Sequence, residues 1–342
     1  MYKILSILCI LCFTSTLNAQ KVKTSQDSIH IFYDKLLSVM EDHYLYKDRV
    51  DWPKIKSEVN QNIREHNDFQ TSLKEVSTIF DFAKADHSRV YFNNSSYAGN
   101  FSGPKAKDFS AEWQNKFASN PKFEVKVLDN KYGYILMPGM TFEDRSKKNI
   151  HKQSQPMYDA INAIRTSTNL KGWIIDLRFN VGGDCMPMIL ALYDFLGDND
   201  VWGALDIDKQ QVLTVKLSKG KYQENGKTTH YINPKGALMD KVKVAVITNM
   251  VTASSGEVTA MSFKGRENTI FIGDKTFGKT TTNRIADLAF SAYMTLTVGY
   301  DCDRNGKFYE QMIPDVTVVK QDNFEDLMHD KNIQEAIKFI NN

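Results

Sequence analysis

Short apolar runs alternate with helical patterns through the second half of the chain, and this alternation limits the chain to a small set of folds. Each run is rich in β-branched, Leu or aromatic residues, and a segment with apolar residues at helical spacing follows most of them. Such alternation indicates an α/β unit whose strands are buried on both faces. The expected strands are 132–137, 173–177, 242–248 and 269–272, and the expected helices are 147–166, 186–196 and 256–264.

The first part of the chain has a different pattern. Apolar residues recur at helical spacing through residues 28–85, which predicts an all-helical domain within 24–92. Residues 93–121 are rich in Asn, Ser, Gly, Lys and Pro, which is typical of a linker or an irregular segment. The α/β unit then occupies 122–342, where residues 289–298 alternate in the manner of an antiparallel strand. A length of 342 residues fits two packed domains.

Residues 1–19 have the composition of a secretory signal peptide. A positively charged start precedes an apolar run from Ile4 to Phe13, and small and polar residues follow as far as Ala19. Cleavage after Ala19 would remove Cys9 and Cys12, and neither cysteine follows a small residue in the way that a lipid anchor favours. We therefore expect an exported protein, periplasmic or secreted, with no membrane span after signal cleavage.

Composition argues against several classes of function. The chain has 43 Lys and Arg against 41 Asp and Glu, a formal net charge of +2, so no footprint for nucleic acid is visible. Cys185 and Cys302 remain after cleavage, as one disulfide or as two thiols, and the core must be hydrophobic. No Cys/His cluster has metal-ligand spacing. Residues 301–306 resemble the start of a calcium loop, but Met312 stands where a Glu is needed, so a turn between strands is favoured.

Two loops of the α/β unit each follow a buried strand and expose backbone. In the first, Gly182 and Gly183 come just before a helix, which suits an anion or oxyanion cradle, although a tight turn would need the same glycines. In the second, Ser254 and Ser255 lie between a strand and a helix, where a hydroxyl would stand at the ligand-binding edge of the sheet. Helix capping is the alternative role of either serine.

Several motifs occur together in a recognisable order. Taken together, they resemble the tail-specific, or C-terminal processing, serine protease family over roughly residues 130–318. The resemblance implies a helical N-terminal domain on a crotonase-like (ClpP/crotonase) α/β protease core. It also implies hydrolysis of a peptide or protein substrate through an acyl-enzyme, with neither metal nor cofactor. The motifs are Asp176-Leu-Arg178, Gly182-Gly183, Thr252-Ala-Ser-Ser-Gly-Glu257, the run from Phe271 to Lys279, and Pro314-Asp-Val316.

The resemblance assigns roles to particular residues. Ser254 stands where the family has its nucleophile, and Lys279 stands where many members have a lysine base. The family usually places a Gln four residues after that lysine, and this chain has Asn283. The oxyanion hole would be formed by the Ser255 N–H group and the loop that contains Gly182 and Gly183. Asp176 and Arg178 are expected to hold that loop in place, and Glu257 to act as a helix-start charge.

A second possible base comes from another branch of the family. The chain has no room for the peptide-binding PDZ domain of the better-known members, so it looks closer to the tricorn-core and retinoid-binding-protein-like branch. In that branch a histidine at the end of the helical domain is the base, which matches His87, and a Glu before the Pro-Asp matches Glu310. The sequence leaves both bases open, and its 25-residue spacing from Ser254 favours Lys279 slightly.

The alternative from another functional class is an exported binding module. It would keep the protease core, lose efficient catalysis, and hold a peptide or an apolar ligand in the cleft between the two domains. The Asn283 substitution favours this alternative, whereas the presence of Ser254, Lys279, His87 and Glu310 together favours a peptidase. The oligomeric state and the cleavage specificity are not predicted.

Overall fold

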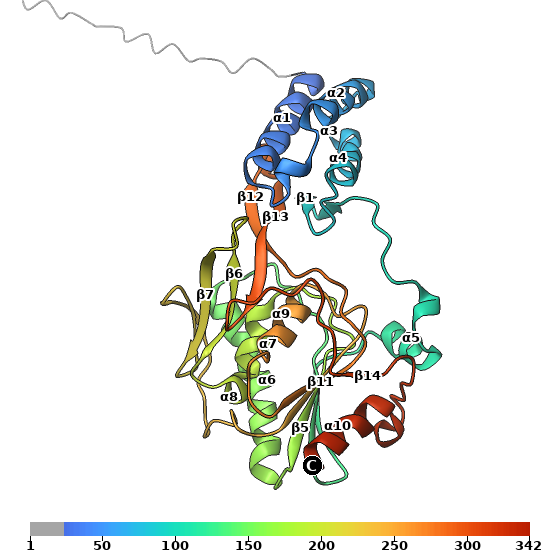
Figure 1. The fold of residues 1–342 in the computed structure, drawn as a ribbon. Coiled ribbons are helices and arrows are strands. Elements are labelled where there is room, and N and C mark those ends of the chain that lie inside the picture. The colour runs from blue at the N-terminus through green and yellow to red at the C-terminus, as the bar shows by residue number, and fades with distance from the viewer. Residues whose placement is uncertain (1–23) are drawn as a thin grey trace, which may run out of the picture.

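The computed structural model describes residues 24–342, and the predicted signal peptide, with Cys9 and Cys12, lies outside them. A helical unit stands at one end of the molecule and an α/β core at the other, and a pair of long strands connects the two (Figure 1). The expected α/β fold with a helical N-terminal region is therefore confirmed. None of the helices in the described range is long and apolar enough to cross a membrane.

The helical unit is built from amphipathic helices that share one apolar cluster. Its first helix begins with a capping box, in which the Asp27 N–H donates to Thr24 Oγ1 and the Thr24 N–H donates to the Asp27 carboxylate. The cluster also contains Met294 and Leu296, which come from a strand close to the C-terminal end of the chain. The helices are α1 (Ser25–His43), α2 (Trp52–Asn62), α3 (Phe69–Ser72) and α4 (Glu75–Ala83), with 3₁₀ turns at Lys47–Arg49 and Ile63–Glu65.

The core sheet has six strands and is parallel except for one edge strand. Its order is β14 (Val316–Thr317), β11 (Thr269–Gly273), β10 (Val244–Thr248), β5 (Gly172–Asp176), β4 (Tyr132–Leu136) and β3 (Glu124–Leu128), of which β3 is antiparallel to β4. All residues of β4, β5 and β10 are buried, which fits their continuous apolar sequence. The parallel strands therefore end together at one edge of the sheet.

Alternate residues of each core strand pack against different helices. Trp173 and Ile175 of β5 join one apolar cluster with α6 (Lys147–Ser167), α7 (Cys185–Ala191), α8 (Tyr193–Leu196) and α9 (Ser255–Met261). Ile174 joins another cluster with α5 (Ala111–Ala118) and α10 (Lys331–Asn341). Helices thus cover both faces of the sheet, and burying each large apolar side chain contributes about 1.5–3 kcal/mol.

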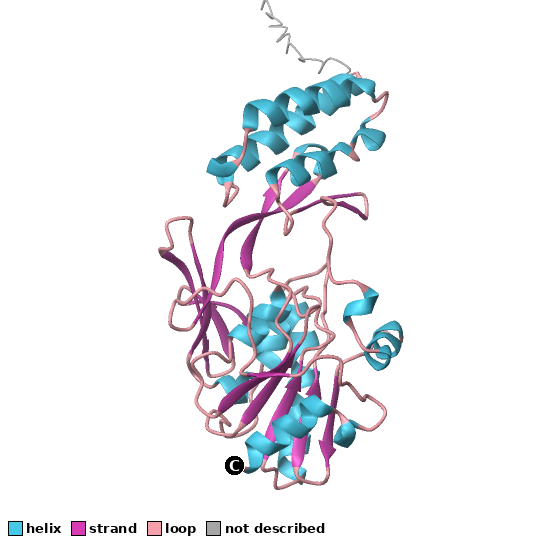
Figure 2. Cartoon of the chain, turned by 45° about the vertical axis from the view of Figure 1, so that its right-hand side comes forward, coloured by secondary structure: helices cyan, strands magenta, loops and turns pink. Residues whose placement is uncertain are grey.

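The second sheet links the two units. It contains β2 (Ser95–Tyr97), β1 (Arg89–Phe92), β13 (Tyr293–Asp303), β6 (Asp200–Leu205), β7 (Gln211–Ser218), β8 (Lys221–Glu224) and β9 (Lys227–Tyr231), and β12 (Thr281–Asp287) also pairs with β13. We call β1, β12 and the paired part of β13 the arm, because these strands extend from the core to the underside of the helices (Figure 2).

Several local expectations differ from the structure. Residues 89–92, expected within the helical domain, form β1 instead, and their Arg-Val-Tyr-Phe sequence favours a strand. The expected linker 93–121 contains β2, a 3₁₀ turn at Ala106–Asp108 and α5. The turn expected near Gly306 is confirmed, since the N–H groups of Asn305 and Lys307 donate to Asp303 Oδ1. Cys185 and Cys302 are both free thiols.

Candidate active site

Ser254 occupies a sharp turn between β10 and α9. Its backbone has φ of 52° and ψ of −119°, a conformation that a non-glycine residue adopts at a cost of about 1–3 kcal/mol. Neighbouring contacts fix this turn to the end of β5, because Thr252 Oγ1 donates to the Leu177 carbonyl at 2.9 Å and the Ala253 N–H donates to the Asn180 carbonyl at 3.0 Å. The strained serine is therefore held on a rigid support.

Glu257 fixes the turn from the other side. Its fully buried carboxylate accepts hydrogen bonds from the N–H groups of Ser254 at 3.0 Å, Gly278 at 2.8 Å and Lys279 at 2.6 Å, and from Thr276 Oγ1. Burial raises the pKa of Glu257, while these hydrogen bonds lower it. Glu257, expected to act as a helix-start charge, thus also joins the turn at Ser254 to the loop that leads into β12.

His87, which follows the last helix of the helical unit, contacts Ser254. Its Nε2 lies 3.0 Å from Ser254 Oγ, and its Nδ1 lies 2.8 Å from Thr281 Oγ1. If Nε2 accepts the serine proton, Nδ1 carries the hydrogen and donates it to Thr281. Burial and, to a smaller extent, the nearby Lys279 lower the pKa of His87 to about 4, and Asp86 opposes the change. The imidazole is therefore neutral at pH 7, as a general base must be.

The arm holds His87 through its backbone as well. Asn283 Nδ2 donates to the His87 carbonyl at 2.8 Å, and Thr297 Oγ1 donates to Asn283 Oδ1 at 2.9 Å. The neighbouring Ser88 Oγ accepts from the Thr297 N–H at 3.2 Å. Asn283, expected from the resemblance to hold a lysine, thus contacts the candidate histidine instead.

Lys279 and Glu310 have partners other than Ser254. The Lys279 ammonium forms an ion pair with Asp86 and lies 5.0 Å from the centre of the Phe277 ring and 5.8 Å from that of Phe101. The Glu310 side chain is exposed, and its backbone carbonyl accepts from Thr280 Oγ1 at 3.2 Å. Within residues 24–342, no hydrogen bond or ion pair joins either side chain to Ser254 or His87. The geometry therefore favours His87, whereas the sequence spacing favoured Lys279.

The glycine loop passes directly beside the serine. Gly182 and Gly183 have φ of 103° and 111°, and a Cβ atom on Gly182 would stand 3.0 Å from Ser254 Cβ. The Gly182 N–H is already engaged, because it donates to Asn180 Oδ1 at 3.1 Å. The N–H groups of Gly183 and Ser255 have no acceptor among the described residues, while Ser255 Oγ donates to the Gly183 carbonyl at 2.6 Å. Two of the three expected oxyanion donors are thus free.

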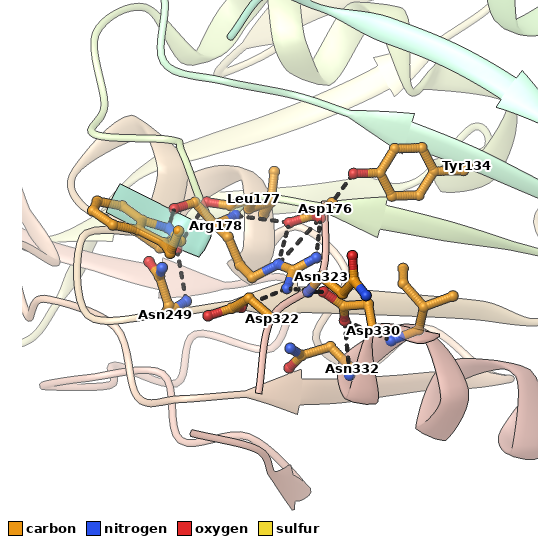
Figure 3. Close-up of polar contacts among 12 residues, drawn as sticks. Tyr134, Asp176, Leu177, Arg178, Asn249, Asp322, Asn323, Asp330 and Asn332 are labelled. Carbon is orange, nitrogen blue, oxygen red and sulfur yellow. Dashed lines mark hydrogen bonds and ion pairs between the residues drawn. The ribbon is translucent and has the colours of Figure 1, made fainter. Parts of the chain in front are cut away.

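A buried charge network anchors the strand that precedes this loop (Figure 3). The Arg178 guanidinium lies 2.7 Å from Asp176 Oδ2, 2.7 Å from Asp322 Oδ1 and 2.8 Å from Asp330 Oδ2. Asp330 also caps α10, since its Oδ1 accepts from the N–H groups of Asn332 and Ile333. The C-terminal helix and the end of β5 are therefore tied together just before the glycine loop.

Comparison with known proteins identifies the family of the chain. Residues 131–318, more than half of the chain, match peptidase family S41. The chain belongs to peptidase family S41. The resemblance to the tail-specific, or C-terminal processing, proteases is thereby confirmed, and the protein is a peptidase by family.

Three relatives of this S41 peptidase extend the likeness beyond the matched range. The nisin-resistance protein of Lactococcus lactis subsp. lactis is 24% identical over 282 residues, which cover 82% of this chain and 80% of that protein. The structure of a lipoprotein from Streptococcus agalactiae superposes with a TM-score of 0.66 at 23% identity, covering 93% of this chain and 96% of that one. A solved structure from Parabacteroides merdae gives a TM-score of 0.57 at 17% identity, covering 92% and 96%. Both structures share the fold, including its helical end.

The sequence did not single out every residue that the fold of this S41 peptidase brings to the site. Thr281 and Thr297 were missed because a threonine in a strand carries no chemical signal of its own. Asp86, which precedes His87 in the sequence, was also missed, although it pairs with Lys279 across the two units. The alternation of side chains along a strand that starts near Lys279 could have placed Thr281 and Asn283 on one face of β12. It could not have shown that this face lies opposite His87.

Proposed function

We propose that this protein is an exported serine peptidase in which Ser254 is the nucleophile and His87 is the general base. The observation that supports this proposal most directly is the 3.0 Å separation of His87 Nε2 from Ser254 Oγ. Nucleophile and base within hydrogen-bonding reach, with a third group orienting the base, form the arrangement that nucleophilic catalysis requires. Here the orienting group is the Thr281 hydroxyl.

The reaction follows from these contacts. Ser254 Oγ attacks the carbonyl carbon of the peptide bond and gives its proton to His87 Nε2, which then passes that proton to the leaving amine. Water, activated by the same imidazole, hydrolyses the acyl-enzyme and releases Ser254. The N–H groups of Gly183 and Ser255 bind the oxyanion, and a donor in such a position contributes about 2.7–4 kcal/mol to transition-state stabilisation.

The surroundings of His87 determine how readily this base accepts a proton. Thr281 is neutral, so no carboxylate is hydrogen-bonded to the imidazolium ion that forms during the reaction. Lys279 disfavours this ion, and the nearby Asp86 favours it. The base is therefore available at low pH but accepts a proton with less driving force than a histidine paired with a carboxylate. In this proposal Lys279 is a charged neighbour of the base, and Glu310 has no direct role.

Location outside the cytoplasm is the second part of the proposal. It rests on the composition of residues 1–19 and on relatives that include a lipoprotein and a nisin-resistance protein. The substrate would be a peptide or protein, as membership of the peptidase family implies.

Labelling with a fluorophosphonate probe tests the nucleophile directly. We expect the wild-type protein to be labelled and to hydrolyse fluorescein-labelled casein, and Ser254→Ala to lose both activities while remaining folded. Ser255→Ala is the matched control and should keep a substantial part of both, because its N–H group remains. A folded wild-type protein that neither labels nor hydrolyses would favour the binding-module alternative instead. Full activity in Ser254→Ala would contradict the assignment of the nucleophile.

A further inference from the structure

The face of the arm that looks away from the helices begins at the catalytic histidine. Strand pairing sets three rows of residues across this face, because direct partners in antiparallel strands point to the same side. Asn283 is the partner of Thr297 and donates to the His87 carbonyl. Ile285 is the partner of Thr295, which also pairs with Arg89, and Asp287 is the partner of Tyr293, which also pairs with Tyr91. The first row contains the groups that hold His87, so the next two rows extend directly from the active site.

The two faces of the arm have different surroundings. Val90, Met294 and Leu296 point to the opposite face and are fully buried against the helical unit. On the face with the three rows, Arg89 is exposed, and the exposed fractions of Ile285 and Tyr293 are 52% and 39%. The arm, whose strands run beneath the helices (Figure 2), thus has an exposed face, and Asn283 at one end of this face donates to the His87 carbonyl.

This surface combines apolar groups with one unpaired cation. The rings of Tyr91 and Tyr293 stack with centroids 4.8 Å apart and an interplanar angle of 11°. Arg89 forms no ion pair with any residue in the described part of the chain, although Asp287 lies in the neighbouring row. Its guanidinium is close enough to His87 to act on the imidazole electrostatically. An unpaired arginine beside exposed aromatic rings is a typical composition for peptide recognition.

We propose that Arg89 is a specificity residue that binds a carboxylate of the peptide substrate, with Tyr91, Tyr293 and Ile285 forming an apolar surface beside it. This inference rests on the proposed peptidase function of Ser254 and His87. Arg89 follows His87 by two residues, which corresponds to roughly 7 Å along a strand. An extended peptide with its scissile carbonyl at Ser254 would therefore bring a group two or three residues away to the Arg89 guanidinium.

The chemistry of the guanidinium selects the ligand. Its planar donors pair with both oxygens of a carboxylate, and this pairing is stronger than a single point contact. Such a carboxylate is either the C-terminus of the peptide or the side chain of an Asp or Glu residue. In either case the preferred substrate carries a negative charge two or three residues from the cut.

The test begins with matched peptides. Peptides from digested casein are incubated with the enzyme, the cuts are read by mass spectrometry, and one cleaved sequence is remade in four forms. One pair of forms differs in having a free or an amidated C-terminus, and the other pair differs in having Asp or Asn at the second or third residue from the cut. In the pair that supplies the carboxylate bound by Arg89, we expect kcat/KM to be at least ten times higher for the peptide with that carboxylate. The terminal and side-chain pairs show which source of carboxylate is used.

Variants of the arm assign the preference to a residue. Arg89→Gln should cleave the neutral and charged peptides at equal rates, and Arg89→Lys should retain part of the preference. Arg284→Gln is the matched control, because Arg284 is exposed on the same arm but pairs with Leu296 on the opposite face. Its preference should equal that of wild type. A wild-type enzyme without preference, or an unchanged preference in Arg89→Gln, would overturn the inference while leaving the peptidase function intact.

A binding measurement keeps the two proposals separable. Affinities of the charged and neutral peptides are measured for Ser254→Ala and for Ser254→Ala combined with Arg89→Gln. We expect the charged peptide to bind the single variant about tenfold more tightly and both peptides to bind the double variant equally. If the wild-type protein hydrolyses no peptide and this difference in affinity is still found, the proposed function fails and the Arg89 site stands. If the affinities do not differ, the Arg89 site fails.

Discussion

A comparison of Lys279 with His87 shows how one contact changes which residue is the candidate base. Both side chains are titratable and both come from segments that resemble the family, but only the imidazole lies against Ser254 Oγ. The ammonium of Lys279 is instead paired with Asp86 and covered by two aromatic rings. Its positive charge acts on the His87 imidazole at a distance, since it lowers the pKa of His87.

Substitution of Lys279 should therefore shift the pH profile without abolishing hydrolysis. In wild type the neutral imidazole predominates above the His87 pKa of about 4, so kcat/KM should rise with pH around that value and then level off. Lys279→Met removes a cation that disfavours the imidazolium, so the pKa of His87 rises and the midpoint of the profile moves to higher pH. Activity at pH 7.5 should remain largely intact, as measured by peptide hydrolysis from pH 3 to 9.

The exposed Lys275 provides the control for this experiment, because it belongs to the same loop. Lys275→Met should leave the midpoint of the profile unchanged. Inactivity of Lys279→Met equal to that of Ser254→Ala, in a folded protein, would show that the lysine is the base after all.

At the scale of elements, the end of β5 depends on charges from the C-terminal segment. Arg178 is buried with three carboxylates, and two of them come from residues 322 and 330. Removing one partner of a buried ionic network leaves uncompensated charges and typically costs about 3–5 kcal/mol. We expect Arg178→Leu to lower the free energy of unfolding by about that amount in urea titrations.

A surface ion pair is the appropriate comparison for Arg178. Lys56 and Glu41 are paired at 2.6 Å with side-chain exposures of 44% and 39%, and Lys56→Met should cost less than about 1 kcal/mol. Equal effects of the two substitutions would mean that the Arg178 network does not stabilise the fold.

Elements with strong periodic patterns were predictable from the sequence, and elements made by distant pairing were not. The buried strands β5 and β10 and the helix α6 lie within a few residues of their expected bounds, because apolar runs and helical spacing are local signals. β1 was missed because four residues next to a helix take their structure from pairing with β13, about two hundred positions later. The motif singled out Ser254 as the candidate nucleophile, whereas a preference between His87 and Lys279 required the position of the helical unit.

At the scale of the molecule, the candidate site is shared between two apolar clusters. Ser254 belongs to the core, and His87 follows the last helix of the helical unit. The helical unit packs on Met294 and Leu296 of the arm. Loosening that packing would release the arm residues Thr281, Asn283 and Thr297 that hold His87. The core sheet would remain covered by its own helices on both faces. Hydrolysis should thus depend on the stability of the helical unit before it depends on that of the core.

Phe80→Ala tests this dependence. Phe80 of α4 is fully buried in the helical cluster, and truncating such a residue costs about 3–5 kcal/mol. As temperature rises, we expect the variant to lose peptide hydrolysis together with hydrogen-exchange protection of α4 amides, while β10 amides stay protected. Ile247→Ala in β10 is the matched core substitution, and it should instead reduce protection of β10 along with hydrolysis. Simultaneous loss of α4 and β10 protection in Phe80→Ala would show that the two units unfold as one, and that His87 cannot leave Ser254 without global unfolding.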